Sequence, residues 1–169
     1  MKDINLLFIG RFQPFHLGHL KIIKKYSKKE FFIKIGVGSS EESHKKENPF
    51  TFEERKKMIQ LALKKEGIKN YSIFALPDFK GADNSWRKNV KKVVGNFNFL
   101  ITGNVWVRRI FEEGVVGVFS YNENEMRHNG LEGKEIRKDL LRGKRKGIPL
   151  EVYRYLVKIK AVERLKNIN

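Results

Sequence analysis

The amino-acid sequence predicts an α/β fold: a doubly wound parallel sheet of five strands in a single domain, with two helices closing the chain. Three observations lead to this prediction. Short apolar runs alternate with stretches of helical periodicity five times. Gly or Pro ends most of these segments. The chain has 169 residues, which suits one domain, and no repeat, low-complexity tract or linker divides it.

Five apolar runs are expected to form the strands. The first is nearly continuous and ends at Gly10, which is typical of a strand buried on both faces of a parallel sheet. Pro77 ends the third run, because proline has no N–H group to donate to a sheet. The five runs comprise residues 4–9, 31–38, 71–76, 97–102 and 115–120.

Six stretches are expected to form helices. The second has the clearest start, because Thr51 can cap it and Glu54 stands three residues on, which is the spacing of a capping box. Pro149 suits the first turn of the last. The six stretches are residues 18–29, the segment between Thr51 and Gly67, and residues 86–94, 105–113, 134–142 and 149–165. Residues 39–48, 78–85 and 121–133 are expected to be loops.

The expected sheet also predicts where ligands bind. Right-handed crossovers place the carboxyl ends of all parallel strands at one edge, and ligands bind at that edge in folds of this kind. Functional side chains are therefore expected in the loops that follow the strands. These loops begin at Gly10, Gly38, Pro77, Gly103 and Ser120.

Composition limits the classes of partner. The net charge of +17 attracts polyanions, but many of the lysines form pairs on expected helices and are most simply solvated. There is no nucleic-acid-binding motif and no interleaving of aromatic and basic residues on a strand, so nucleic acid is not an expected partner. A further reading is that the charge steers anionic substrates to a site.

The absence of Cys excludes disulfides, thiolate metal sites and a Cys nucleophile. No apolar run approaches the roughly 20 residues that a membrane span needs, and the N-terminus does not resemble a signal peptide. The expected location is the cytoplasm, with no membrane partner.

The loop after the first strand carries the densest chemistry. Arg11, His16 and His19 stand there with the small residues Gly10 and Gly18. The N-terminus of a helix offers unpaired N–H groups and a positive dipole, and anions bind there readily. His16 and His19 lie three residues apart at this start, so both can face one phosphate group. No carboxylate stands nearby in the sequence, so the two histidines are not expected to form a zinc site. The loop is therefore expected to bind phosphate.

The same ten residues, Gly-Arg-Phe-Gln-Pro-Phe-His-Leu-Gly-His, resemble the His-x-Gly-His motif of the nucleotidyltransferase superfamily. Their long form resembles that of the archaeal nicotinamide mononucleotide adenylyltransferases. Further blocks resemble this family, and together they extend over almost the whole chain. They are Ser43-His44, Asn48 to Thr51, Glu54-Arg55, Thr102 to Asn104, Val107-Arg108, Phe111, Glu135 to Arg137, and Val162 to Leu165.

The resemblance implies a Rossmann-like nucleotidyltransferase fold and adenylyl transfer. The phosphate of nicotinamide mononucleotide (NMN) attacks the α-phosphorus of ATP, giving NAD and pyrophosphate. Because the attacking group is already an anion, the protein's work is positioning and charge stabilisation. Arg11, His16, His19 and Arg137 are the catalytic residues this implies, as cations that hold the ATP phosphates. Mg²⁺ is expected with those phosphates, without a set of protein ligands.

The resemblance also divides the site between two substrates. The residues expected at ATP are Gly10, Arg11, Phe12, Gln13, His16, Gly18, His19, Gly103, Asn104, Lys134 and Arg137. The residues expected at the acceptor are Gly38, Ser39, His44, Phe50, Asp78, Asp83, Asn84 and Trp86, with the ring of Trp86 stacked on nicotinamide. His128 is expected at the surface.

Two segments depart from the family pattern. The loop between Asp78 and Trp86 is one residue longer, so Asp83 rather than Asn84 stands three residues before the Trp. Residues 132–134 read Glu-Gly-Lys where the family has small hydroxyl residues. These departures leave open a sister enzyme that acts on another phosphorylated acceptor, such as flavin mononucleotide or phosphopantetheine. The charge leaves open a basic nucleic-acid-binding protein on the same fold. A homo-oligomer is expected from the resemblance alone.

Overall fold

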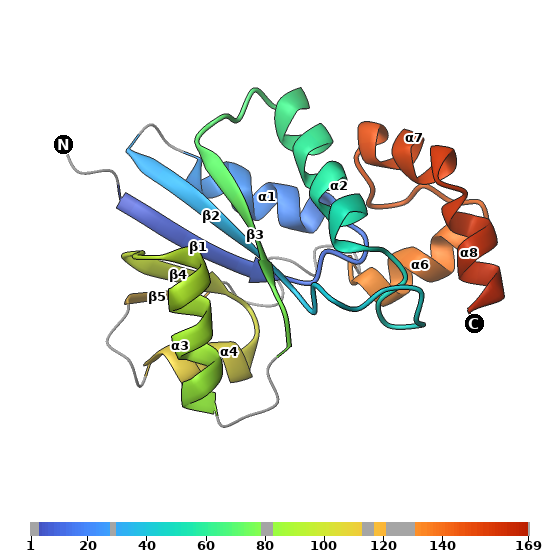
Figure 1. Ribbon diagram of the computed structural model, residues 1–169. Helices are drawn as coiled ribbons and strands as arrows, with labels where there is room; N and C mark the ends of the chain where they lie inside the picture. The colour runs from blue at the N-terminus through green and yellow to red at the C-terminus, as the bar shows by residue number, and fades with distance from the viewer. Residues whose placement is uncertain (1–3, 28–29, 79–82, 113–116, 121–130, 169) are drawn as a thin grey trace.

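A computed structural model describes residues 4–27, 30–78, 83–112, 117–120 and 131–168. Its five-stranded sheet has the order β3-β2-β1-β4-β5, and every neighbouring pair is parallel. The predicted α/β fold with a five-stranded parallel sheet is therefore confirmed (Figure 1). The strands are β1 (Ile4–Gly10), β2 (Phe31–Gly38), β3 (Tyr71–Leu76), β4 (Phe99–Thr102) and β5 (Gly117–Ser120).

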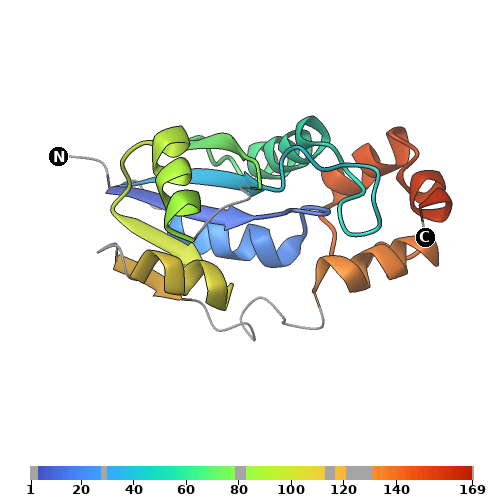
Figure 2. The ribbon, with the colours of Figure 1, turned by 60° about the horizontal axis from the view of Figure 1, so that its bottom comes forward.

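Helices connect the strands and close the described chain. Those between strands are α1 (Leu17–Tyr26), α2 (Phe52–Lys65), α3 (Asp83–Val94) and α4 (Val105–Glu112). After β5 come α6 (Gly133–Leu141), α7 (Leu150–Lys158) and α8 (Ala161–Asn167). Figures 1 and 2 show these last three gathered beyond one end of the sheet, opposite the end where the N-terminus lies. They stand where the carboxyl end of β1 points.

Side chains of the central strand alternate between two apolar cores. Leu6 and Phe8 belong to the larger cluster, which includes residues of α1, α2, α6, α7 and α8. Leu7 belongs to the smaller one, which includes residues of α3 and α4. Because successive side chains of a strand point to opposite faces, a central strand covered on both faces must be apolar throughout, as the sequence predicts.

The prediction of a single helix over residues 149–165 is wrong. Residues 149–165 form two helices, because the chain turns at Lys160, whose φ of 54° is left-handed. The apolar pattern continues through this turn without a Gly or Pro, so the sequence carries no signal for it. Three helices therefore follow β5 among the described residues, where two were expected.

The start of α3 also differs from the prediction. The helix begins at Asp83 rather than at Trp86, so Asp83 and Asn84 belong to its first turn and not to a loop. Apolar periodicity can detect a helix only from its first buried residue, and a polar first turn escapes it. The other strand and helix ends differ by a few residues. Residues 121–130 of the predicted loop lie outside the described part.

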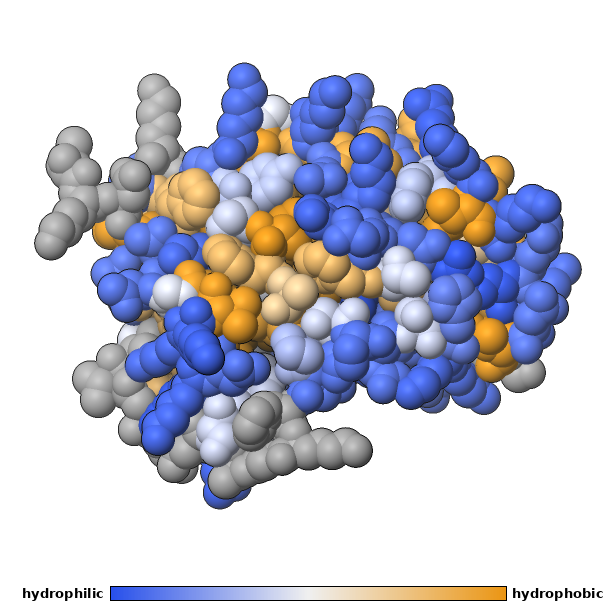
Figure 3. All heavy atoms as spheres, viewed as in Figure 1, coloured by the Kyte–Doolittle hydropathy of each residue, from blue (hydrophilic) through white to orange (hydrophobic). Residues whose placement is uncertain are grey.

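One edge of the sheet is partly open. All but the last residue of β3 are half-buried. Figure 3 shows the molecule from the side of Figure 1. An apolar area crosses the middle of this view, where β3 runs in Figure 1, and hydrophilic surfaces lie on both sides of it. Within the described residues, no helix is long and apolar enough to span a membrane.

Candidate functional site

The two histidines of the first loop form one unit at the start of α1. The Nδ1 atom of His16 accepts the main-chain N–H of His19 at 3.4 Å, and the Nδ1 atom of His19 accepts that of His16 at 3.2 Å. Their rings stack with centroids 3.6 Å apart. This is a capping box built from two histidines, and it explains why the motif spaces them three residues apart.

These hydrogen bonds also fix the protonation of the rings. A nitrogen that accepts an N–H group carries no proton, so each Nε2 atom carries the N–H of a neutral ring. Burial lowers the pKa of His16 from 6.5 to about 3. Burial lowers the pKa of His19 as well, and the neighbouring His16 lowers it further. Both rings are therefore neutral hydrogen-bond donors at pH 7 in this structure, rather than the cations expected from the sequence.

Phe12 supports the histidines from behind. Its ring meets that of His19 edge-on, with centroids 4.7 Å apart, and is 1% exposed. A side chain at Gly10 would meet this ring at 2.9 Å, which requires glycine there. The expectation that Phe12 contacts ATP is not met by its side chain, since the loop turns it inward, with a φ of 53°.

Gln13 joins three segments of the site. Its side-chain amide donates to the carbonyl of Phe50 at 3.0 Å and accepts the N–H of Phe50 at 2.9 Å. Its own main-chain carbonyl accepts a hydrogen bond from Arg137 at 2.7 Å. The Gln13 side chain is thus engaged with the chain rather than open to ATP. The ring of Phe50 is fully buried, which removes it from the acceptor surface where it was expected.

Arg137 reaches the histidine loop from α6. Besides Gln13 it faces Glu47, whose carboxylate lies 3.5 Å from its Nη2 atom. Burial lowers the pKa of Arg137, Glu47 opposes this, and Arg11 lowers the pKa further. The positive charges of Arg11 and Arg137 repel one another, and a bound phosphate group would relieve this repulsion.

The first turn of α6 lies close to the loop. A side chain at Gly133 would meet the Gln13 carbonyl oxygen at 3.0 Å, so glycine permits this approach. Lys134 follows on the exposed side of the same turn. Glu132, at the N-cap, makes no capping hydrogen bond through its side chain. Close packing against Gln13 therefore explains the glycine at position 133. The exposed side chain of Lys134 can contact a ligand from the solvent side.

The sequence analysis missed the role of Arg55. This side chain of α2 is fully buried and donates to the carbonyls of Arg11 at 3.0 Å, Gly38 at 2.7 Å and Ser39 at 3.0 Å. It ties the loop after β1 to the loop after β2. Burial lowers its pKa to about 10, so it stays charged at neutral pH. The sequence marked Arg55 as part of a motif but gave no sign of its partners.

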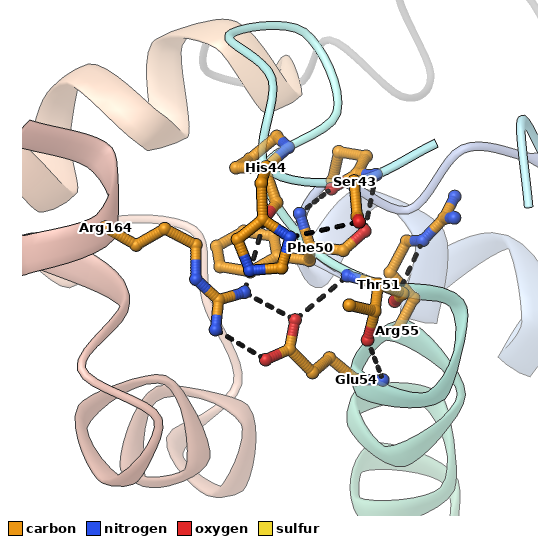
Figure 4. A network of polar contacts seen from close by, with 9 residues as sticks. Ser43, His44, Phe50, Thr51, Glu54, Arg55 and Arg164 are labelled. Atoms are coloured by element: carbon orange, nitrogen blue, oxygen red, sulfur yellow. Dashed lines mark hydrogen bonds and ion pairs between the residues drawn. The ribbon is translucent and has the colours of Figure 1, made fainter. Parts of the chain in front are cut away.

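A second arginine holds the start of α2 from the far end of the chain. Arg164 of α8 pairs with both carboxylate oxygens of Glu54, at 2.6 and 2.7 Å, and donates to the carbonyl of Pro49 (Figure 4). Glu54 also accepts the N–H of Thr51, which confirms the predicted capping box. Burial alone would raise the pKa of Glu54, but the bonds from Arg164 and Thr51 lower it overall.

The loop after β4 is used differently from the expectation. The side-chain oxygen of Asn104 accepts the N–H groups of Trp106 at 2.9 Å and Val107 at 3.2 Å, and so caps α4. Gly103 precedes it and is half-buried. The side-chain oxygen of Asn104 is thus bound to the helix, and only the amide NH2 group of this exposed side chain is open to a nucleotide.

The expected acceptor residues fall into two groups. Ser39 donates to Asp78 at 3.1 Å, which joins the ends of β2 and β3 beside Gly38. His44 is exposed and bonds Ser43 through Nδ1. Trp86, by contrast, is 8% exposed and packs in the smaller core, against Phe111 and the half-exposed Trp106.

The side chains of Asp83 and Asn84 lie outside the described part of the structure, as does His128. Within residues 4–27, 30–78, 83–112, 117–120 and 131–168, no three His, Asp or Glu side chains form a group that could hold a metal ion.

Comparison with known proteins identifies relatives along the whole chain. Residues 7–101, more than half of it, match the cytidylyltransferase-like family. A nicotinamide-nucleotide adenylyltransferase of Methanolobus tindarius is 37% identical over 96% of this chain and 92% of its own. A protein of the same name from Archaeoglobus fulgidus is 38% identical, over 96% of this chain and 95% of its own.

Solved structures agree in fold. The bifunctional NMN adenylyltransferase/ADP ribose pyrophosphatase of Francisella tularensis, complexed with AMP and a Mn ion, matches with a TM-score of 0.76 at 27% identity. The match covers 98% of this chain and 52% of that one, so this chain spans about half its length. A putative nicotinate-nucleotide adenylyltransferase of Vibrio parahaemolyticus has the same fold, with a TM-score of 0.64 at 16% identity.

Proposed function

Since the chain belongs to the nicotinamide-nucleotide adenylyltransferase family, we propose how its residues divide the work of joining AMP from ATP to NMN. In this reaction a phosphate oxygen of NMN attacks the α-phosphorus of ATP. The bond from that phosphorus to the bridging oxygen breaks, and pyrophosphate leaves with NAD as the other product. The observation that carries the assignment is the meeting of Arg137 with the histidine loop at the carbonyl of Gln13.

The histidines supply donors for the phosphates. Their Nδ1 atoms are held by the main chain, so the Nε2–H groups remain to point at a phosphate. Arg11 and Arg137 supply the positive charge, and the planar guanidinium of each can contact two phosphate oxygens. The start of α1 adds the positive dipole of a helix N-terminus. No general base is needed, because the attacking phosphate is already an anion.

A divalent ion, which we propose is Mg²⁺, accompanies the phosphates and neutralises charge on the leaving group. We propose that phosphate oxygens supply its ligands. Ser39 and Asp78 stand at the ends of β2 and β3, His44 lies further along the loop after β2, and we propose that all three face the acceptor. We also propose a cytoplasmic homo-oligomer. The size of the assembly can be measured by light scattering.

The test of the reaction is a panel of acceptors with ATP and Mg²⁺, followed by pyrophosphate release. NMN should turn over and give NAD, while flavin mononucleotide and phosphopantetheine stay at the blank. Turnover of one of these two, with NMN at the blank, would contradict the proposal.

The test of the phosphate site is His19→Ala. Loss of one Nε2–H donor should lower kcat/KM by roughly 100-fold, while circular dichroism shows a folded protein. Arg137→Ala should act in the same direction. The matched control is Arg142→Ala, an exposed arginine one residue beyond the end of α6. Full activity in His19→Ala would remove the phosphate role assigned to that ring.

A further inference from the structure

Glu47 pairs with the guanidinium group that the proposed function assigns to phosphate. One nitrogen of Arg137, Nη1, donates to the main-chain carbonyl of Gln13 at 2.7 Å. The other, Nη2, lies 3.5 Å from a carboxylate oxygen of Glu47. The side chain of Arg137 is 11% exposed and that of Glu47 is 60% exposed, so the carboxylate contacts a mostly buried cation from the solvent side.

A short turn of the main chain presents this carboxylate. Glu47 belongs to the loop between β2 and α2, where the main chains of Lys45 and Asn48 exchange two hydrogen bonds, of 3.2 and 3.1 Å. Lys45 also pairs with Glu42 of the same loop. The main chain on both sides of Glu47 is therefore held in place. Its mostly exposed side chain can leave Arg137 by rotating into solvent, and the turn does not have to open.

The pair differs from the ion pairs that lie on the surface of one helix. Lys138, for example, pairs with Glu135 three residues before it on α6. Glu47 instead joins the loop after β2 to α6, and it contacts a cation that adjoins the histidine loop. Burial lowers the pKa of Arg137, as does the charge of Arg11, and Glu47 opposes both effects. Glu47 therefore supplies, at this place, the negative charge that a bound phosphate group would supply.

A carboxylate and a phosphate group bind a guanidinium in the same way, through oxygens that accept its planar N–H groups. Two anions on the same side of Arg137 would repel each other. We propose that Glu47 competes with ATP for Arg137, so that a phosphate group of ATP displaces the carboxylate when it binds. An ion pair with an exposed partner is weak, and the larger charge of the triphosphate prevails. Glu47 thus sets the affinity of the site, and it admits to Arg137 only ligands that bring phosphate charge. The inference rests on the phosphate role of Arg137 in the proposed function, which it deepens.

The test is Glu47→Gln, which removes the charge and keeps the shape of the side chain. This variant should bind ATP roughly two- to fivefold more tightly, since one weak ion pair no longer has to be broken. Calorimetric titration with ATP and Mg²⁺, without an acceptor, measures the affinity. The matched control is Glu53→Gln, which removes an exposed carboxylate 3.7 Å from Lys56 and changes the net charge equally. Equal tightening in the two variants would indicate a general effect of net charge and overturn the inference.

A second measurement asks whether the effect depends on Arg137. In the Arg137→Ala background Glu47 has no guanidinium to occupy, so adding Glu47→Gln should lose most of its effect on the affinity for ATP. A full gain in this background would indicate simple repulsion between Glu47 and phosphate, and would overturn the inference. Inorganic tripolyphosphate, which has no nucleoside, should show the same gain as ATP when Arg137 is present. In steady-state kinetics Glu47→Gln should lower the KM for ATP and leave the KM for NMN unchanged.

The outcomes also separate this inference from the function on which it rests. If the unmodified enzyme makes NAD and Glu47→Gln binds ATP no more tightly than it does, the inference fails and the function stands. If the unmodified enzyme makes no NAD from NMN and ATP, but Glu47→Gln binds ATP and tripolyphosphate more tightly, the proposed reaction fails and the competition at Arg137 stands.

Discussion

His16 and His19 show how a motif can be fixed by its own main chain. Each ring accepts the N–H group of the other residue, so the pair orients itself before any ligand arrives. Burial keeps both rings neutral, which lowers the cost of placing two basic groups 3.6 Å apart. A neutral ring also gives up less hydration than a cation when phosphate binds.

The low pKa of His16 predicts how stability depends on pH. The unfolded chain takes up a proton below about pH 6.5, but folded His16 does so only near 3. The unfolded state therefore binds more protons in this window, and stability present above pH 6.5 is lost as the pH falls. The expected slope is at most about 1.4 kcal/mol per pH unit for each such histidine.

Urea unfolding between pH 6.5 and 5 would measure this slope, in a range above the titration of Glu54. His16→Asn is the matched variant, because its side-chain oxygen can still accept the N–H of His19. The slope should be smaller in this variant. An equal slope in both proteins, or a ring proton of His16 that titrates near 6.5 by NMR, would refute the assignment.

Helices far apart in sequence meet at the start of α2. Arg164 of α8 joins Glu54 and Pro49, which places the last described helix against the segment that leads from Phe50 to α2. Both partners are mostly buried, with side-chain exposures of 18% and 15%. Pairs of this kind differ from surface ion pairs, because removing one partner leaves the other buried without compensation.

Arg164→Ala should therefore lower the free energy of unfolding by about 2–4 kcal/mol. The matched control is Arg108→Ala, which removes an exposed pair with Glu112 at 2.7 Å and should cost no more than about 1 kcal/mol. Chemical denaturation gives both values. Similar losses in the two variants would show that the α8 contact is an ordinary surface pair.

The helices and strands themselves could be predicted from the sequence, but many of the contacts between them could not. Strands, most helices and the capping box at Thr51 depend on local periodicity and spacing, and these predictions are confirmed. Arg55 and Arg164 were missed as supports, since many of their partners are main-chain carbonyls that no pattern marks. Phe50 and Trp86 lie in motif positions, but burial depends on packing against distant helices. Their inward orientation could not be inferred from sequence.

At the scale of the whole molecule, the net charge of +17 predicts a kinetic effect that no single residue explains. Both substrates are anionic through their phosphates, and a positive field raises the rate at which such molecules meet the site. Lys and Arg outnumber Asp and Glu by 36 to 19. A field of this kind is screened over about 10 Å at 0.1 M salt.

The value of kcat/KM for ATP should therefore fall several-fold between low salt and about 0.5 M monovalent salt. kcat should change little, since steering acts on encounter and not on chemistry. Measurements at constant free Mg²⁺ would exclude loss of the ion as a cause. A flat profile would show that the lysines serve only to solvate the surface.

The hydrogen bond between Gln13 and Arg137 can form only after the ribosome has synthesised both residues. The two residues are 124 positions apart. A ribosome adding roughly 5–20 residues per second needs about 6–25 seconds to extend the chain from one to the other. During that interval the histidine loop lacks Arg137. Arg164, which binds Glu54 at the start of α2, is synthesised later still. The last strand, β5, ends at Ser120, so every strand of the sheet is synthesised before Arg137 completes the histidine loop.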